Sequence, residues 1–278
     1  MFERVLFPLD FSEQSLRMFD CIMELKHFGT KEIVLVFVSA GGQPLTYGQR
    51  GILDRLKRDL RQAGFRTSEV IASGEPVKEI LQTAERENVS LIAMASSGKG
   101  KARELIVGST SFGVLRSTRW PVLIGKFRAI GGAGRKGVRQ GRRPIFQRAL
   151  VPIDLATCRP IYEEILPRLS ALGLREAILF HVVESTKYAL DDGERFKQVL
   201  DQLEMHREEL SGQGCTVTTH VHFGTVSYNI LEATRELGAS MILLGTHRKT
   251  LFQEIALGGN SEEVIRRSPV PLLIVPCE

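Results

Sequence analysis

The fold is decided by a stretch that occurs twice in the chain, VLFPLD at residues 5–10 and ALVPID at residues 149–154. The same offset of 144 residues (149 − 5) relates Ile33–Val38 to Ala177–Val182. After one length difference of six residues, the offset becomes 150 (224 − 74). Six pairs of identical residues share the offset of 150: Gly74 and Gly224, Ile80 and Ile230, Ser90 and Ser240, Gly108 and Gly258, Ser111 and Ser261, and Pro121 and Pro271. A fixed offset over so many positions predicts two copies of one domain.

Each copy alternates short apolar runs with longer amphipathic runs, which predicts alternating strands and helices. The first copy should have strands at Arg4–Pro8, Glu32–Val38, Thr67–Ala72, Leu91–Ala95 and Val122–Gly125. Its helices should run from Ser12 to about Phe28, and over Leu45–Gly64, Pro76–Glu87 and Gly108–Ser117. In the second copy the order from Arg148 to Val275 repeats: Arg148–Ile153, Cys158–Leu172, Ala177–Val183, Asp191–Gly212, Thr216–Phe223, Val226–Leu237, Met241–Leu244, Gly258–Arg267 and Leu272–Val275.

Strict alternation with fully apolar strands predicts a parallel sheet that is covered by helices on both faces. Because crossovers between parallel strands are right-handed, each sheet should be doubly wound. The expected fold class is α/β, with two tandem doubly wound five-stranded parallel-sheet domains. A ligand crevice is then expected at the carboxyl ends of the strands, where the winding direction reverses.

The net charge of +5 comes from one segment between the copies. Residues 125–148 hold eight Lys or Arg and no acidic residue, so the rest of the chain carries 5 − 8 = −3. The segment also contains six glycines and has no helical or strand periodicity before about Ile145. We therefore expect domain 1 at residues 1–126, a flexible basic linker at 127–146 and domain 2 at 147–278.

Several classes of protein are disfavoured by the sequence. No apolar run approaches 18 residues, so no membrane span is expected, and the N-terminus lacks the features of a signal peptide. A cytoplasmic location follows as an expectation. The cysteines Cys21, Cys158, Cys215 and Cys277 have no CxxC spacing, so we predict no metal site and interpret them as buried or partly buried free thiols.

Two loops carry the chemistry that the predicted crevice offers. Asp10 follows the first strand, and its carboxylate suits hydrogen bonding to ribose hydroxyls. Ala95-Ser96-Ser97-Gly98 follows the fourth strand, and nine residues later Gly108-Ser109-Thr110-Ser111 opens a helix, whose exposed N–H groups favour anions. The alternative is that Asp10 and Ser12 only cap one helix, and Ser109 and Ser111 another.

Together these features resemble the universal stress protein family: Asp after the first strand, and G-x2-G-x9-G-[ST] after the fourth. The likeness covers nearly the whole chain outside the linker. The family fold, adenine nucleotide alpha-hydrolase-like, has five parallel strands in the order 3-2-1-4-5. One subgroup binds ATP or AMP through this motif, and another lacks the motif and does not.

The resemblance implies nucleotide-contacting positions in both copies. In the first copy they are Pro8, Leu9, Asp10, Val38, Met94, Ala95, Gly98, Gly108, Ser109, Thr110 and Ser111. In the second copy they are Pro152, Ile153, Asp154, Val182, Gly245, His247, Arg248, Gly258, Gly259, Asn260 and Ser261. Both copies depart from the motif: Ala95 replaces the first Gly in one, and Arg248 and Gly259 replace the second Gly and the phosphate hydroxyl in the other. Arg248 could block the phosphate path or bind phosphate, so we favour the first copy as the better site and leave the second open.

The expected function is a stress-response or signalling module that binds ATP or AMP, with Mg²⁺ accompanying ATP. No general acid–base pair emerges from the sequence, so we expect no dedicated enzyme and at most slow ATP hydrolysis. One alternative is an interaction or regulatory protein with degenerate pockets. Another is nucleic-acid contact through the basic linker. A linker that is simply solvated is the more common explanation of such a basic stretch.

The last expectation concerns the two fifth strands. Val122–Ile124 and Leu272–Val275 are matching apolar edges, and an unpaired apolar edge invites aggregation. Antiparallel pairing of the two would cover both at once and create an internal pseudo-dimer. Further homodimerisation is compatible with this arrangement but is not required by it.

Overall fold

The computed structural model describes residues 2–96, 108–126, 144–154, 161–184, 193–212, 214–247 and 259–277. In the first half, strands and helices alternate as the sequence predicts. The strands are β1 (Arg4–Leu9), β2 (Glu32–Ser39), β3 (Arg66–Ser73), β4 (Leu91–Ala95) and β5 (Val122–Gly125). The helices are α1 (Glu13–Glu24), α2 (Tyr47–Gln62), α3 (Pro76–Arg86) and α4 (Ser109–Ser117), with short 3₁₀ turns at Leu25–Phe28 and Ala40–Gly42.

The second half repeats this order. Its strands are β6 (Arg148–Pro152), β7 (Glu176–Val183), β8 (Thr216–Phe223), β9 (Met241–His247) and β10 (Leu272–Cys277). Its helices are α5 (Leu166–Ala171), α6 (Gly193–Leu210), α7 (Val226–Glu236) and α8 (Gly259–Arg267). A π-helical turn at Ile161–Ile165 precedes α5, so the first helix of this half is less regular than its counterpart α1.

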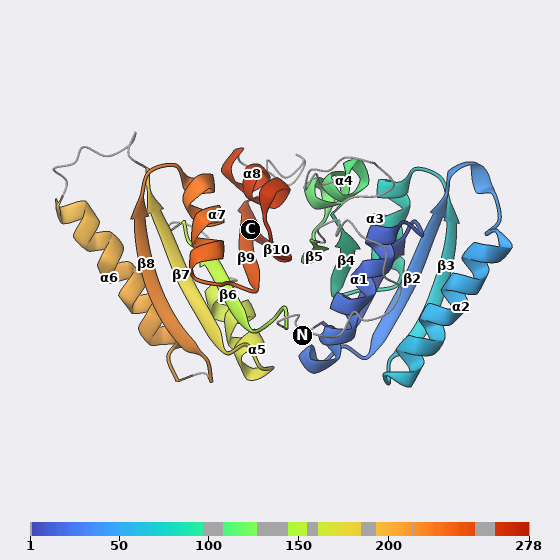
Figure 1. Cartoon of the computed structure of the whole chain (residues 1–278), viewed down its shortest axis with the longest axis horizontal. Coiled ribbons are helices and arrows are strands. Elements are labelled where there is room, and N and C mark those ends of the chain that lie inside the picture. Colours follow the sequence, from blue (N-terminus) through green and yellow to red (C-terminus); the bar gives the residue numbers. More distant parts are fainter. Residues whose placement is uncertain are drawn as a thin grey trace.

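All ten strands form one sheet in the order β3-β2-β1-β4-β5-β10-β9-β6-β7-β8 (Figure 1). Each half therefore has the predicted order 3-2-1-4-5, read outward to inward, and the α/β fold class is confirmed. Neighbours within a half are parallel, as in the register Val5↔Ile33 and Val5↔Leu91. The halves meet where β5 and β10 pair antiparallel, with Leu123 opposite Leu273, which confirms the predicted pairing of the two fifth strands.

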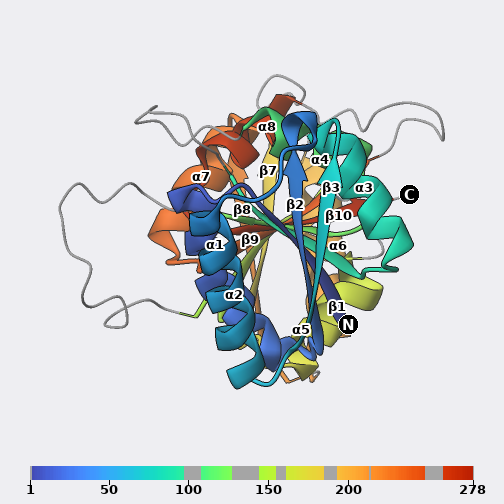
Figure 2. The ribbon, with the colours of Figure 1, turned by 90° about the vertical axis from the view of Figure 1, so that its right-hand side faces the viewer.

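The alternation of side chains along the strands builds a core on each face of the sheet. Val5, Phe7 and Leu9 belong to one core, and Leu6 belongs to the other. Helices α1 and α2 pack on the first face, while α3 and α4 pack on the second (Figure 2). Burial of both faces explains why the inner strands are almost entirely apolar. The outer strands β3 and β8 are not: each contains several polar residues and is mostly half-buried or exposed, so the expectation of fully apolar strands is wrong for these two.

Local signals begin the helices where the sequence places them. Ser12 caps α1 by accepting a hydrogen bond from the Ser15 N–H. Thr46 and Gln49 form a capping box at the start of α2, and Pro76 occupies the first turn of α3. Gly29 ends the first helical segment with a left-handed φ of 79°.

Most of the expected linker, residues 127–143, lies outside the described part of the chain. Its last two residues are ordered and buried: Phe146 packs its ring on Phe28 at 4.2 Å, and the Ile145 N–H donates to Glu24 Oε2 at 2.6 Å. The chain thus docks against the first half before it enters β6.

Two further expectations concern cysteines and membranes. Cys277 is disulfide-bonded, so the expectation of free thiols is wrong for this residue, whereas Cys21 and Cys215 carry thiols. A disulfide was not foreseen because no sequence spacing indicates which cysteines meet in space. None of the described helices is both long and apolar enough to span a membrane.

Candidate functional site

The expected crevice of the first half lies at the carboxyl ends of β1, β2 and β4, which are neighbours in the sheet. Pro8 and Leu9 are the last residues of β1, and Asp10 follows directly. Val38 lies near the end of β2. Met94 and Ala95 end β4, and both are buried. Parallel strands end at the same edge of a sheet, so these predicted residues gather there.

Asp10 sits half-buried between β1 and α1. Its Oδ1 accepts a hydrogen bond from the Ser12 N–H at 2.9 Å, and Phe11 between them takes a left-handed φ of 57°. The proposed capping role of Ser12 is therefore real, and Asp10 supports the same turn. Because a carboxylate can accept several hydrogen bonds, this local role leaves acceptor capacity on Asp10 for a ligand.

The start of α4 is held against the end of β4 by two hydrogen bonds. The Gly108 N–H donates to the Ser96 carbonyl oxygen at 2.5 Å, and Ser111 Oγ donates to the Ala95 carbonyl oxygen at 2.9 Å. Gly108 is the N-cap, and no side chain of the described residues caps the helix. Within that part of the chain, the first N–H groups of α4 therefore lie at the crevice without a side chain to satisfy them, which is the arrangement that attracts an anion.

The predicted roles of the hydroxyls differ in this geometry. Ser111 is buried and its hydroxyl proton already serves the Ala95 carbonyl. Ser109 is exposed and Thr110 is half-buried, so both are more accessible than Ser111. Gly98 lies outside the described residues, as do its neighbours 97–107.

The second half places its predicted residues differently. Pro152 ends β6, and Ile153 and Asp154 follow, with Asp154 exposed where Asp10 is half-buried. Val182 lies in β7 and is buried. Gly259, Asn260 and Ser261 form the first turn of α8. Arg248 and Gly258 lie outside the described residues.

The main difference between the halves is the end of the fourth strand. Gly245 corresponds to Ala95 at the offset of 150 (245 − 95), but β9 continues past it to His247. The two extra residues pair with β10, with Pro276 opposite Thr246 and Cys277 opposite His247. Within the described part of this half, Ser261 forms no hydrogen bond to β9 like that of Ser111 to β4.

Sequence reasoning missed two contributors to the first site. One is the Ser96 carbonyl, since a backbone acceptor leaves no trace in residue type. The other is the aromatic pair Phe11 and Phe37, whose ring centroids lie 5.2 Å apart beside Asp10. The position of Phe11 directly after Asp10 was an available signal.

No group of three or more His, Cys, Asp or Glu side chains able to hold a metal ion occurs among the described residues. A protein-held metal centre therefore has no support in this part of the chain.

Comparison with known proteins agrees with this architecture. The model of the universal stress protein family matches residues 1–126 and again residues 146–276. The chain belongs to the universal stress protein family. A universal stress protein from Archaeoglobus fulgidus shares 26% identity and a TM-score of 0.73, over 99% of this chain and 96% of that one. The family resemblance inferred from the two motifs is thus confirmed.

Single-domain family members match about half of the chain. Universal stress protein MJ0577 of Methanocaldococcus jannaschii is 26% identical over 155 residues, which are 45% of this chain and 96% of the relative. YxiE of Bacillus subtilis is 27% identical over 146 residues, 45% of this chain and 99% of the relative. Two matches of the family model in one chain indicate a tandem universal stress protein.

Proposed function

We propose that the first half of this universal stress protein binds ATP or AMP in the crevice between Asp10 and the start of α4. The observation that carries the proposal is the pair of hydrogen bonds that hold Gly108 and Ser111 on the end of β4. They direct an uncapped helix N-terminus toward the same sheet edge as Asp10. An adenine nucleotide would meet phosphate donors at one end of this edge and a ribose acceptor at the other.

The surroundings suit the remaining parts of the ligand. The half-buried rings of Phe11 and Phe37 provide apolar surface beside Asp10 that a base could contact. Val38 lies on the neighbouring strand. Family membership supports the same assignment, because the Gly108–Ser111 segment matches the motif of the nucleotide-binding subgroup.

We also propose that binding, rather than catalysis, is the main activity. Neither Asp10 nor the first turn of α4 presents a nucleophile paired with a base among the described residues. If ATP binds, Mg²⁺ would be held chiefly by its phosphates. Sustained ATP turnover near 1 s⁻¹ or above, the range of ordinary enzymes, would contradict this view.

The second half favours a different role. β9 stays in the sheet as far as His247, two residues beyond Gly245, the counterpart of the last residue of β4. This observation favours a structural or partner-binding role for the second half. Nucleic-acid contact through residues 127–143 remains an alternative that a salt titration of RNA binding, with and without that segment, would test.

Calorimetric titration with ATP and with AMP tests the proposal. Wild-type protein should bind at least one of them, and Gly108→Glu should weaken binding by about 1,000-fold. A like charge about 4 Å from a phosphate costs about 4 kcal/mol at an effective dielectric constant of 20. The substitution should preserve the fold, since acidic groups stabilise helix N-termini. Absence of binding to the wild type, or equal binding to the variant, would overturn the proposal.

A further inference from the structure

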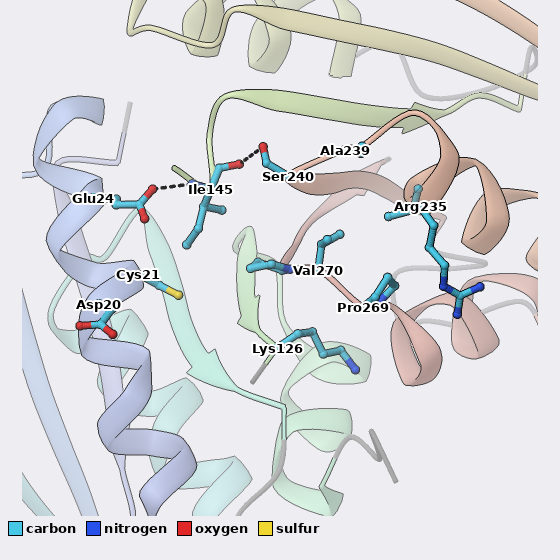
Figure 3. A pocket seen from close by; sticks show the side chains of 13 residues that line it. Asp20, Cys21, Glu24, Lys126, Ile145, Arg235, Ala239, Ser240, Pro269 and Val270 are labelled. Atoms are coloured by element: carbon cyan, nitrogen blue, oxygen red, sulfur yellow. Dashed lines mark hydrogen bonds between the residues drawn. The ribbon is translucent and has the colours of Figure 1, made fainter. Parts of the chain in front are cut away.

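A cavity of about 590 Å³ lies between the two halves, away from both helix starts discussed above (Figure 3). It is built by four segments. They are α1, the two ends of the connection between the halves, the end of α7 with the turn that follows it, and the turn before β10. A cavity of this size matches small-molecule sites in other proteins.

The turn before β10 differs from its counterpart in a way that leaves space. In the first half, Trp120 occupies this turn, with the Arg119 guanidinium 4.7 Å from the ring centroid. At the offset of 150 the second half has Val270, which lines the cavity between two prolines, Pro269 and Pro271. A valine fills much less volume than an indole, so this turn takes up less space in the second half than in the first.

Lys126 is the unusual side chain of this cavity. It follows β5 directly and is 5% exposed, although it belongs to the basic segment 125–148 that accounts for the positive net charge. Its Nζ donates one hydrogen bond, to the Arg266 carbonyl oxygen at 3.0 Å in the last turn of α8. An ammonium has three donors, and the end of a helix supplies only a partial negative charge.

The charges around Lys126 do not neutralise it. No carboxylate of the described residues forms an ion pair with it, and residues 127–143 contain no Asp or Glu. Burial and the positive charge of Arg266 lower the pKa of Lys126 to about 7. On the facing elements, Glu24 accepts from the Ile145 N–H, Arg235 pairs with Glu232, and Asp20 is exposed. The lining therefore holds two carboxylates, Asp20 and Glu24, but neither forms an ion pair with Lys126 among the described residues.

We propose that the cavity between the halves binds a small organic anion, with its acidic group on Lys126 and its apolar part against Ile145, Pro269 and Val270. This inference does not rest on the nucleotide proposal, since it involves other elements and another surface. The acidic group can be a carboxylate or a phosphate monoester, because both accept hydrogen bonds from an ammonium. Figure 3 shows Lys126 extending from β5 toward the side of the cavity formed by Pro269 and Arg235.

Binding should be linked to proton uptake. A bound anion stabilises the charged form of Lys126 and raises its pKa. At pH 8 the free protein holds Lys126 mostly neutral, so anion binding should take up close to one proton. Affinity should weaken as pH rises above about 7, because protonation then has to accompany binding.

Hexanoate, hexyl phosphate and the neutral 1-hexanol are suitable probes. Calorimetry at pH 8 in two buffers of different ionisation enthalpy measures affinity and proton uptake together. At least one anion should bind about 10-fold or more tightly than 1-hexanol, with uptake approaching one proton. The comparison of hexanoate with hexyl phosphate identifies the preferred acidic group.

Two variants and one control locate the site. Lys126→Met should lose the preference for anions and the proton uptake. Val270→Trp, which introduces the residue of the first half, should block binding with Lys126 still present. Lys31→Met removes an exposed lysine paired with Glu3 and should change neither the preference for anions nor the proton uptake. Failure of both anions to bind the wild type, unchanged binding by Lys126→Met, or binding without proton uptake would overturn the proposal.

Discussion

The two halves share one strand order but differ at the point where the fourth strand ends. In the first half, β4 ends at Ala95, and the next carbonyl, of Ser96, accepts from the Gly108 N–H. In the second half, β9 continues to His247 and stays paired with β10. The comparison teaches that two copies of one fold can differ in how far the fourth strand stays paired with the fifth, at the edge of the sheet where the candidate site lies.

The neighbouring fifth strands explain this difference. β5 spans four residues and ends at Gly125, after which Lys126 turns toward α8. β10 spans six residues and gives β9 a partner as far as Cys277. Thr246, a residue suited to strands, also donates from Oγ1 to the Val275 carbonyl oxygen at 3.5 Å. The longer partner strand therefore keeps residues 245–247, at the start of the second motif, inside the sheet.

The largest effect is expected where the two fifth strands join the halves. Leu123 and Leu273 are fully buried and face each other across the antiparallel pair. Replacing both by Lys places two like charges in the core, which should lower the free energy of unfolding by about 5 kcal/mol or more. Urea denaturation measures this loss.

Ile71→Lys is a matched control for that experiment. Ile71 is 45% exposed on the outer strand β3, so the same change of residue should cost far less there. If the double variant is as stable as this control, the central pair does not hold the halves together.

A smaller effect is expected at the end of β5, where Lys126→Met should stabilise the protein in a pH-dependent way. The pKa of Lys126 is lowered from 10.5 to about 7 by burial and Arg266. Between these values the unfolded chain keeps a proton that the folded protein has lost, so the wild type gains stability as pH rises. The free energy of unfolding of Lys126→Met should thus exceed that of the wild type most at about pH 6. This difference should decrease by about 1 kcal/mol per pH unit between pH 7 and 9.

Denaturation curves of wild type and Lys126→Met over this pH range provide the measurement. Lys31→Met, at an exposed ion pair, should leave the pH dependence of stability unchanged. If the difference in free energy of unfolding between Lys126→Met and wild type is the same at every pH, Lys126 is not a buried, weakly neutralised cation.

The smallest effect is expected at the contact of α4 with α8. Arg116 pairs with Glu262 at 3.4 Å, and Arg266 lies 4.2 Å from the Phe112 ring centroid. Arg266, as the main hydrogen-bond donor, lowers the pKa of Glu262. The stabilisation that Glu262 gains from these arginines is therefore present above the ordinary glutamate pKa of 4.5. It is lost as pH falls through the lowered pKa of Glu262.

Glu262→Gln should cost less than about 1 kcal/mol at pH 7, because solvent screens these half-exposed charges. The difference from wild type should shrink as pH falls below about 4. Glu204→Gln, which breaks an exposed pair with Arg207 inside α6, serves as a control with no link between the halves. If the loss of stability in Glu262→Gln does not change with pH, the ion pair is not its cause.

The fold could be predicted because several independent features of the sequence indicate the same arrangement of strands and helices. The repeated VLFPLD and ALVPID stretches, the apolar strands and the helix caps at Ser12 and Pro76 all indicate one α/β topology. The pairing of β5 with β10 followed from two matching apolar edges. These signals are local or periodic, so residue types alone record them.

The site was predicted less completely, for physical reasons. The extension of β9 to His247 depends on the length of its partner β10, which no motif states. The Ser96 carbonyl contributes through the backbone. Lys126 resembled the linker charges that follow it, and only the packing of α8 and the Ile145 segment buries it.

The most direct test is calorimetric titration of ATP into wild type and two matched variants, Ser109→Glu and Gly259→Glu. These residues correspond at the offset of 150 (259 − 109), and both are exposed in the first turns of α4 and α8. The account predicts one nucleotide per chain, about 100-fold weaker binding by Ser109→Glu, and unchanged binding by Gly259→Glu. Two nucleotides per chain, or a loss of binding in Gly259→Glu but not in Ser109→Glu, would contradict it.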